Sequence, residues 1–178
     1  MSPQTPDLRY PIGQFSPGDP VTQAQVDAWI DDIATLPADL RRTVSGLTDD
    51  QLDTPYRPGG WTVRQVVHHL PDSHMNSLVR FKWALTENRP LIKAYDERGW
   101  AALPDCRESI ANSLDLLDAL HRRWVSLLRE LSWPQLQREF VHPESGPSRL
   151  AVTVGSYAWH GRHHLAHIER LIEREGWR

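Results

Sequence analysis

A chain of 178 residues without a Gly/Ser-rich or charge-rich linker is long enough to fill one core, so we expect a single domain over residues 1–178. The 20 Lys and Arg residues and 23 Asp and Glu residues are interspersed and give a net charge of −3, which argues against a nucleic-acid partner. The single cysteine, Cys106, excludes an internal disulfide and a multi-thiolate zinc site. Without a membrane-length apolar run or a signal-like N-terminus, the protein is expected to be soluble and cytoplasmic.

The first part of the chain predicts an arm followed by a helix. Residues 1–21 hold five of the 14 prolines and are expected to form an extended N-terminal arm that drapes over the domain. Thr22 and Gln25 resemble a capping box, which predicts the start of the first helix. Pro37 is expected to interrupt or restart that helix, because proline lacks the backbone N–H that a helix interior needs.

Three further helices follow, predicted over residues 62–86, 107–131 and 152–175. The connections between them are long, at residues 88–106 and 132–151. No segment shows a convincing strand pattern. Four amphipathic helices of this kind predict an all-α fold, a four-helix bundle with long crossover loops, whose interior commonly hosts metal sites.

The densest group of reactive side chains lies in the last helix, where four of the nine histidines fall within eight residues. Residues four apart share a helix face, which pairs His160 with His164 and His163 with His167. The apolar positions of this helix place His160 and His164 on the buried side and His163 towards solvent. An inward pair of imidazoles one turn apart predicts metal ligands, and the alternative is a pair of hydrogen-bonded histidines at the edge of the core.

A third ligand has to come from another element, and the second helix offers His68, His69 and His74. Its apolar periodicity places His74 on the core side and His68 away from the core, so periodicity alone nominates His74. His69 shares a polar stripe with Asn76 and Arg80, which is either a solvated face or the lining of a site. From the residues alone, both His69 and His74 are candidates.

Two segments carry a family resemblance, Gly60-Trp-Thr-Val-Arg-Gln-Val-Val-His-His69 and Tyr157-Ala-Trp-His-Gly-Arg-His-His164. Together with residues 8–13 and 140–145 they resemble the YfiT-like branch of the DinB-like superfamily, and the similarity spans most of the chain. In that superfamily one metal histidine lies eight residues after a tryptophan such as Trp61, and two more form a His-x-x-x-His pair. The resemblance implies one divalent ion per subunit, zinc first and nickel next, with open positions for water or substrate. The implied ligands are His69, His160 and His164.

The resemblance also implies a function and an assembly. YfiT-like proteins are described as metal-dependent hydrolases or as S-transferases that attach the thiol bacillithiol to electrophiles, and they resemble known homodimers. Both reactions use a metal that lowers the pKa of a bound water or thiol. The alternatives are a metal-dependent binding or sensor module without turnover, and a dimeric bundle whose histidines are structural.

Three side chains that follow His69 on the same helix are candidates for a small-molecule site. Arg80 is expected to bind a carboxylate of the thiol, because arginine recognises carboxylates with two hydrogen bonds. Asn76 lies between His69 and Arg80 along the stripe that a ligand would follow. Asp72, one turn after His69, is expected to orient an imidazole or to accept the proton of the nucleophile.

Overall fold

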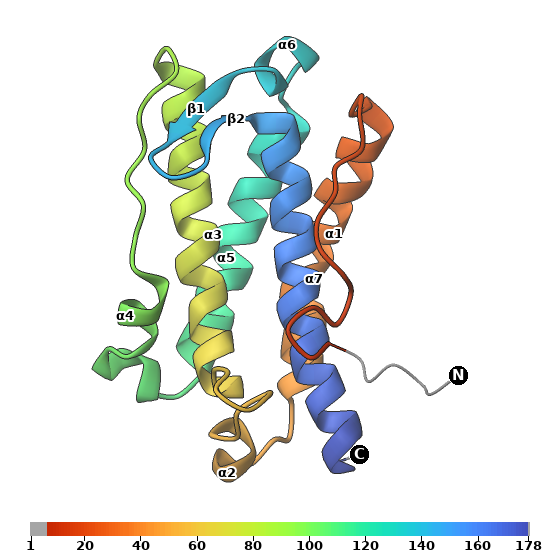
Figure 1. Ribbon diagram of the computed structural model, residues 1–178, viewed down its shortest axis with the longest axis vertical. Coiled ribbons are helices and arrows are strands. Elements are labelled where there is room, and N and C mark those ends of the chain that lie inside the picture. Colours follow the sequence, from red (N-terminus) through yellow and green to blue (C-terminus); the bar gives the residue numbers. More distant parts are fainter. Residues whose placement is uncertain (1–6, 178) are drawn as a thin grey trace.

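In the computed structural model, which describes residues 7–177, four long helices form a bundle (Figure 1). Around the bundle, α1 and α3 each contact both α5 and α7, so α1 lies diagonally opposite α3. The four-helix bundle expected from the sequence is confirmed. The long helices are α1 (Gln23–Val44), α3 (Val63–Thr86), α5 (Ala111–Arg129) and α7 (Leu150–Glu175).

The short elements lie in the connections. They are α2 (Asp49–Leu52), α4 (Glu97–Ala101), the 3-10 turn η1 (Pro104–Arg107), α6 (Trp133–Leu136), β1 (Glu139–His142) and β2 (Gly146–Arg149). The connection from α3 to α5 runs back along the bundle, so these two helices point the same way (Figure 1). The connection from α5 to α7 stays at one end, where β1 and β2 form an antiparallel hairpin. The sequence did not predict this hairpin, since strands of four residues are too short to show a clear alternation.

The helix ends follow the signals in the sequence. Thr22 and Thr62 cap α1 and α3, and each forms a reciprocal capping box with a glutamine three residues later. The helix α7 ends at Glu175 and is capped by Gly176, whose φ of 64° is the left-handed conformation that glycine adopts without a steric cost. These local patterns set where the site-bearing helices begin and end.

The helix α1 continues through Pro37, where the sequence predicted an interruption. Proline has no backbone N–H, so the carbonyl of Ile33, four residues earlier, loses its usual helical donor. Nδ1 of His121 on α5 donates to this carbonyl instead, at 2.6 Å. A neighbouring helix thus satisfies the carbonyl, and α1 does not need to break there.

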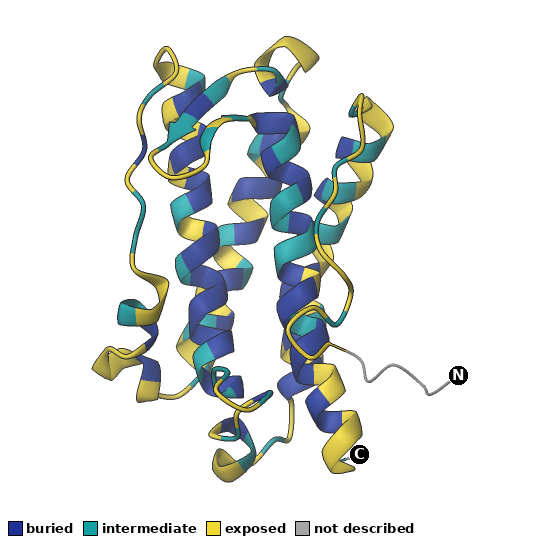
Figure 2. Cartoon of the chain, in the orientation of Figure 1, coloured by how far each residue is buried: buried dark blue, intermediate teal, exposed yellow. Residues whose placement is uncertain are grey.

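Two apolar clusters fill the interior, one towards each end of the bundle, and the inner faces of the helices are buried accordingly (Figure 2). One cluster contains Phe81 and Trp124, and the other contains Leu70 and Ile168. Three of the long helices carry histidines at the level where they pass from one cluster to the other. These residues are His74 on α3, His121 on α5, and His160 and His164 on α7.

Residues 7–21 of the N-terminal arm cover part of α7, as the sequence predicted, and residues 1–6 of the predicted arm lie outside the described residues. The ring of Tyr10 lies 6.0 Å from that of His163, and Nε2 of His167 donates to the carbonyl of Arg9 at 3.3 Å. His163 is consequently only 8% exposed. The prediction that His163 points to solvent is wrong, because the face of α7 that carries it is covered by a segment distant in sequence.

His68 is likewise buried, although the periodicity of its helix placed it away from the core. Its Nε2 donates to the carbonyl of Glu108 at 3.2 Å, and its Nδ1 accepts from the hydroxyl of Ser113 at 2.7 Å. The crossover connection and α5 therefore cover the side of α3 that a single apolar stripe leaves open. Within residues 7–177, every helix is too short or too polar to span a membrane.

Candidate metal centre

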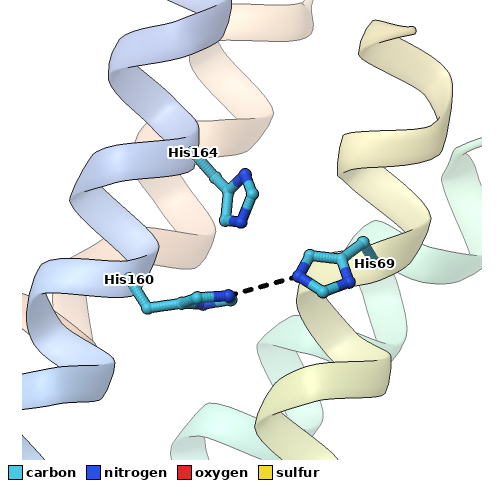
Figure 3. Close-up of side chains that lie close together, drawn as sticks. All are labelled: His69, His160 and His164. Carbon is cyan, nitrogen blue, oxygen red and sulfur yellow. Dashed lines mark hydrogen bonds between the residues drawn. The ribbon is translucent and has the colours of Figure 1, made fainter. Parts of the chain in front are cut away.

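Three imidazoles from two facing helices meet inside the bundle (Figure 3). His69 projects from α3, and His160 and His164 project from α7, one turn apart. The Nε2 atoms of His69 and His160 are 3.2 Å apart, and one nitrogen from each of the three rings lies within 4.8 Å of the others. Two nitrogen ligands of a tetrahedral ion with bonds of about 2.0–2.1 Å are separated by about 3.3 Å. The distance of 3.2 Å between Nε2 of His69 and Nε2 of His160 matches such a ligand pair.

Burial keeps the three imidazoles neutral. It lowers the pKa of His69 to about 4 and lowers the pKa values of His160 and His164 well below their usual range, with a smaller contribution from neighbouring histidines. A neutral imidazole has a lone pair on one ring nitrogen, which is the form that binds metal. Within residues 7–177, Nδ1 of His164 is buried without a hydrogen-bond partner. Closely spaced ring nitrogens of neutral histidines, one of which has a second nitrogen without a hydrogen-bond partner among the described residues, fit the coordination of a zinc or nickel ion.

His74, the candidate from periodicity, lies behind this cluster. Its Nε2 is 3.1 Å from Nδ1 of His160, and its Nδ1 is 2.8 Å from Nε2 of His121. His69 is only 4% exposed, because its imidazole faces α7, where its Nε2 lies 3.2 Å from Nε2 of His160. The structure thus groups the three histidines that the family resemblance implied, with His74 in contact with one of them.

Two cavities meet at His160. The first, of about 530 Å³, is also lined by Trp61 and His164, and the second, of about 220 Å³, extends along Arg80 and Tyr157 towards the hairpin. Glu97 and Trp159 line both cavities. His160 is only partly buried in the protein, so the cluster can be approached from this side. The larger cavity falls within the size range of small-molecule sites, about 300–1,000 Å³.

Arg80 lies in the wall of the cavity that begins at His160. Its side chain is buried, and its guanidinium donates to the hydroxyl of Tyr157 at 3.4 Å and to the carbonyl of Lys93 at 3.5 Å. Both partners are neutral. A buried guanidinium whose hydrogen bonds to neutral oxygens are long keeps N–H donors for an anionic group. The carboxyl of Glu97, which lines the same cavity, also interacts with its charge.

Asp72 and Asn76, the other two candidates on α3, do not share the cavity wall that Arg80 forms. Nδ2 of Asn76 donates to the backbone carbonyl of Asp72, one turn earlier on α3, at 2.9 Å. Burial raises the pKa of the Asp72 carboxyl to about 6, and the charge of Asp105 adds to this effect. Within the described part of the chain, neither side chain is among those that line the two cavities at His160.

Glu97 is the acidic residue that lines both cavities at His160, and no motif or periodicity in the sequence marks it as a site residue. It begins α4, within the crossover connection. Partial burial raises the pKa of its carboxyl, and the charge of Arg80 opposes this shift. A residue in an irregular connection has no periodicity that could place it, and only the length of the connection indicated a functional segment.

A helical bundle with a histidine cluster contributed by facing helices defines a class of metal-binding four-helix proteins. This chain belongs to the DinB superfamily, which it matches over residues 23–168. The resemblance noted in the sequence is confirmed.

Proteins similar to this chain are named for a metal-dependent activity. A protein of Bacillus cereus strain B4264 is 56% identical over 96% of this chain and 99% of its own length, and it is named a "putative metal-dependent hydrolase". A protein of Bacillus mycoides strain KBAB4 has the same identity, coverage and kind of name. A solved structure is described as "YfiT from Bacillus subtilis is a probable metal-dependent hydrolase with an unusual four-helix bundle topology". It matches with a TM-score of 0.93 at 50% identity, over 96% of this chain and 99% of that chain.

Proposed function

We propose that this protein is a metal-dependent enzyme that binds one divalent ion through His69, His160 and His164 and acts on a small acidic molecule. Three neutral imidazoles at ligand spacing and the names of the relatives support the metal. Zinc is the first candidate and nickel the second, because imidazole ligands suit both. When bound, such an ion lowers the pKa of a water or a thiol and supplies a nucleophile at neutral pH.

Within this proposal, we assign the transfer of a low-molecular-weight thiol such as bacillithiol to an electrophile as the first reaction, and hydrolysis as the second. The observation that carries the assignment is Arg80, a buried guanidinium with long hydrogen bonds to neutral oxygens in the wall of the cavity that begins at His160. Bacillithiol carries carboxylates at the end remote from its thiol, so the same molecule could reach both residues. The names of the relatives favour hydrolysis, and the two reactions share one way of making the nucleophile.

A carboxylate is then needed to accept the proton of the nucleophile. Glu97 is favoured by the geometry because it lines both cavities at His160, whereas Asp72, the candidate from the sequence, borders neither among the described residues. Replacing a general base commonly lowers the rate by about 100-fold or more. We expect this loss in kcat for Glu97→Gln and a smaller one for Asp72→Asn. A larger loss in Asp72→Asn would give the role to Asp72, with Asn76 supporting it from the next turn.

The proposed function is tested on one zinc-loaded preparation, assayed in parallel for conjugation of bacillithiol to monochlorobimane and for ester and amide hydrolysis. Arg80→Ala should raise the KM for bacillithiol more than it lowers kcat, because it removes binding energy remote from the reacting atoms. Arg80→Lys is the matched control, since it keeps the charge and loses the paired hydrogen bonds. Hydrolysis without thiol transfer would reverse the order of the two reactions. Neither activity in a zinc-binding protein would favour a sensor or binding module.

We extend the proposal to a homodimer that works in the cytoplasm. Three apolar side chains recur every four residues on the outer face of α3, where each is 38% exposed, and they are Met75, Val79 and Trp83. A stripe of this kind supports a contact between two copies of the chain, because a symmetric dimer joins the same patch of both subunits.

A further inference from the structure

A continuous chain of hydrogen bonds joins all four long helices and ends on a candidate metal ligand. It starts at the carbonyl of Ile33 on α1, which Pro37 leaves without a helical donor. Nδ1 of His121 lies 2.6 Å from this oxygen, Nε2 of His121 lies 2.8 Å from Nδ1 of His74, and Nε2 of His74 lies 3.1 Å from Nδ1 of His160. Each ring uses both nitrogens, and the bonds pass from α1 through α5 and α3 to α7.

The position of every proton in this chain of hydrogen bonds follows from its first acceptor, the carbonyl of Ile33. A carbonyl oxygen can only accept, so Nδ1 of His121 carries the proton. Burial lowers the pKa of His121 to about 4, so its ring is neutral and its Nε2 is an acceptor. Nδ1 of His74 must then donate to that atom, which leaves Nε2 of His74 as the acceptor for a proton on Nδ1 of His160.

The opposite arrangement is unfavourable. If Nε2 of His74 carried the proton, its Nδ1 and Nε2 of His121 would present two lone pairs to each other across 2.8 Å. Both atoms are buried, and an unsatisfied buried acceptor of this kind costs about 1–3 kcal/mol. The proton of His160 therefore belongs on Nδ1, and the lone pair of His160 belongs on Nε2, the atom that lies 3.2 Å from Nε2 of His69.

We propose that His74 and His121 are positioning residues that fix the tautomer and ring orientation of His160, so that its Nε2 is presented to the metal. The inference rests on the proposed function only in taking His160 as a ligand. Metal-binding histidines commonly donate their second N–H to a carbonyl or carboxylate. In this protein the carbonyl belongs to α1, and it acts on His160 through two further imidazoles.

This arrangement ties the ligand to the register of the whole bundle. A shift of α1, α3 or α5 along its axis would break one of these hydrogen bonds and leave the His160 ring free to rotate or to change tautomer. Pro37 has a specific place here, because the missing N–H frees the carbonyl that sets the direction of all the bonds that follow.

The test compares two substitutions of His74 that differ in the atom offered to His160. Gln has a carbonyl oxygen that can reach the place of Nε2 and accept from Nδ1 of His160, whereas Leu fills a similar volume without an acceptor. Zinc affinity is measured by competition with a chromophoric chelator. Loss of such an outer partner typically weakens metal binding about 10–100-fold, which we expect for His74→Leu, and His74→Gln should recover most of that loss.

A second variant acts one ring further from the metal. In His121→Asn the side-chain amide nitrogen takes the place of Nδ1 and can still donate to the carbonyl of Ile33, while the acceptor for His74 is lost. We expect weaker zinc binding than in the wild type, although His121 contacts none of the three candidate ligands through a hydrogen bond among the described residues. Urea denaturation of each variant shows whether it is folded.

Long-range ¹H–¹⁵N spectra of the metal-free protein read the tautomer directly, without metal or activity. His160 should be protonated at Nδ1 in the wild type, whereas an isolated histidine in water favours the proton on Nε2, and His74→Leu should move it towards that form.

Equal zinc affinities in wild type and a folded His74→Leu, an equal loss in His74→Gln, or Nε2 protonation of wild-type His160 would each overturn the inference. If His74→Leu does not fold, the spectra and His121→Asn decide the question. A wild-type protein with the Nδ1 tautomer that binds no zinc would retain the hydrogen-bond chain and refute the proposed function.

Discussion

Acidification should destabilise the metal-free protein, and His121 should account for a measurable part of the effect. Burial lowers the pKa of this histidine from 6.5 to about 4 in the folded protein. Between these two values the unfolded chain binds more protons than the folded chain does, so lowering the pH favours unfolding. The contribution of His121 to stability is thus present above about pH 6.5 and is lost as the pH falls towards 4.

The size of the effect follows from the pKa difference. Each pH unit between the two pKa values changes the free energy of unfolding by about 1.4 kcal/mol per histidine. Lowering the pH from about 7 to about 5 covers roughly 1.5 units of that interval, so His121 alone should remove about 2 kcal/mol. With a urea m-value of about 2 kcal/mol per molar, the midpoint should fall by about 1 M through this residue.

The assay is urea denaturation of metal-free wild type and His121→Asn at both pH values. The other buried histidines are present in both proteins, so the difference between the two pH dependences reports His121 together with its effect on the pKa of His74. We expect the variant to be less stable than the wild type at the higher pH and to lose about 2 kcal/mol less on acidification. Parallel pH dependences in the two proteins would refute the reasoning, because they would show that His121 has a similar pKa in the folded and unfolded states.

Further predictions concern the metal, the assembly and the packing of α7. Alanine at each of the three candidate ligands should abolish stoichiometric metal binding, and His163→Ala should largely retain it; full occupancy by metal analysis in any ligand variant would contradict the site. These ligands are His69, His160 and His164. Sedimentation at micromolar concentration should give twice the subunit mass of 20.5 kDa, with Trp83→Glu shifting the protein to the monomer, and a wild-type mass of 20.5 kDa would refute the dimer. Gly161→Ala should lower the free energy of unfolding by about 1–2 kcal/mol, because the new methyl group meets the side chain of Leu36 on α1. Unchanged thermal stability would show that this contact adjusts freely.

Patterns local in sequence determined much of the bundle and part of its site. The capping boxes at Thr22 and Thr62 marked helix starts because their hydrogen bonds span only three residues. The apolar periodicity of the last helix selected His160 and His164 as the inward pair, because one strongly apolar face had to be buried. The family resemblance added His69, which the residues alone left as an alternative to His74.

Contacts between distant segments decided the remaining features. The side chain of His69 is buried by its contact with His160 on α7, and His163 is buried by the N-terminal arm. Neither contact could follow from the periodicity of a single helix. Glu97 comes from an irregular connection that only the folded chain places beside His160. The role of Pro37 required its freed carbonyl to meet His121 on another helix. Local sequence therefore determines which groups a helix presents and leaves unsatisfied, and tertiary packing decides which distant groups meet them.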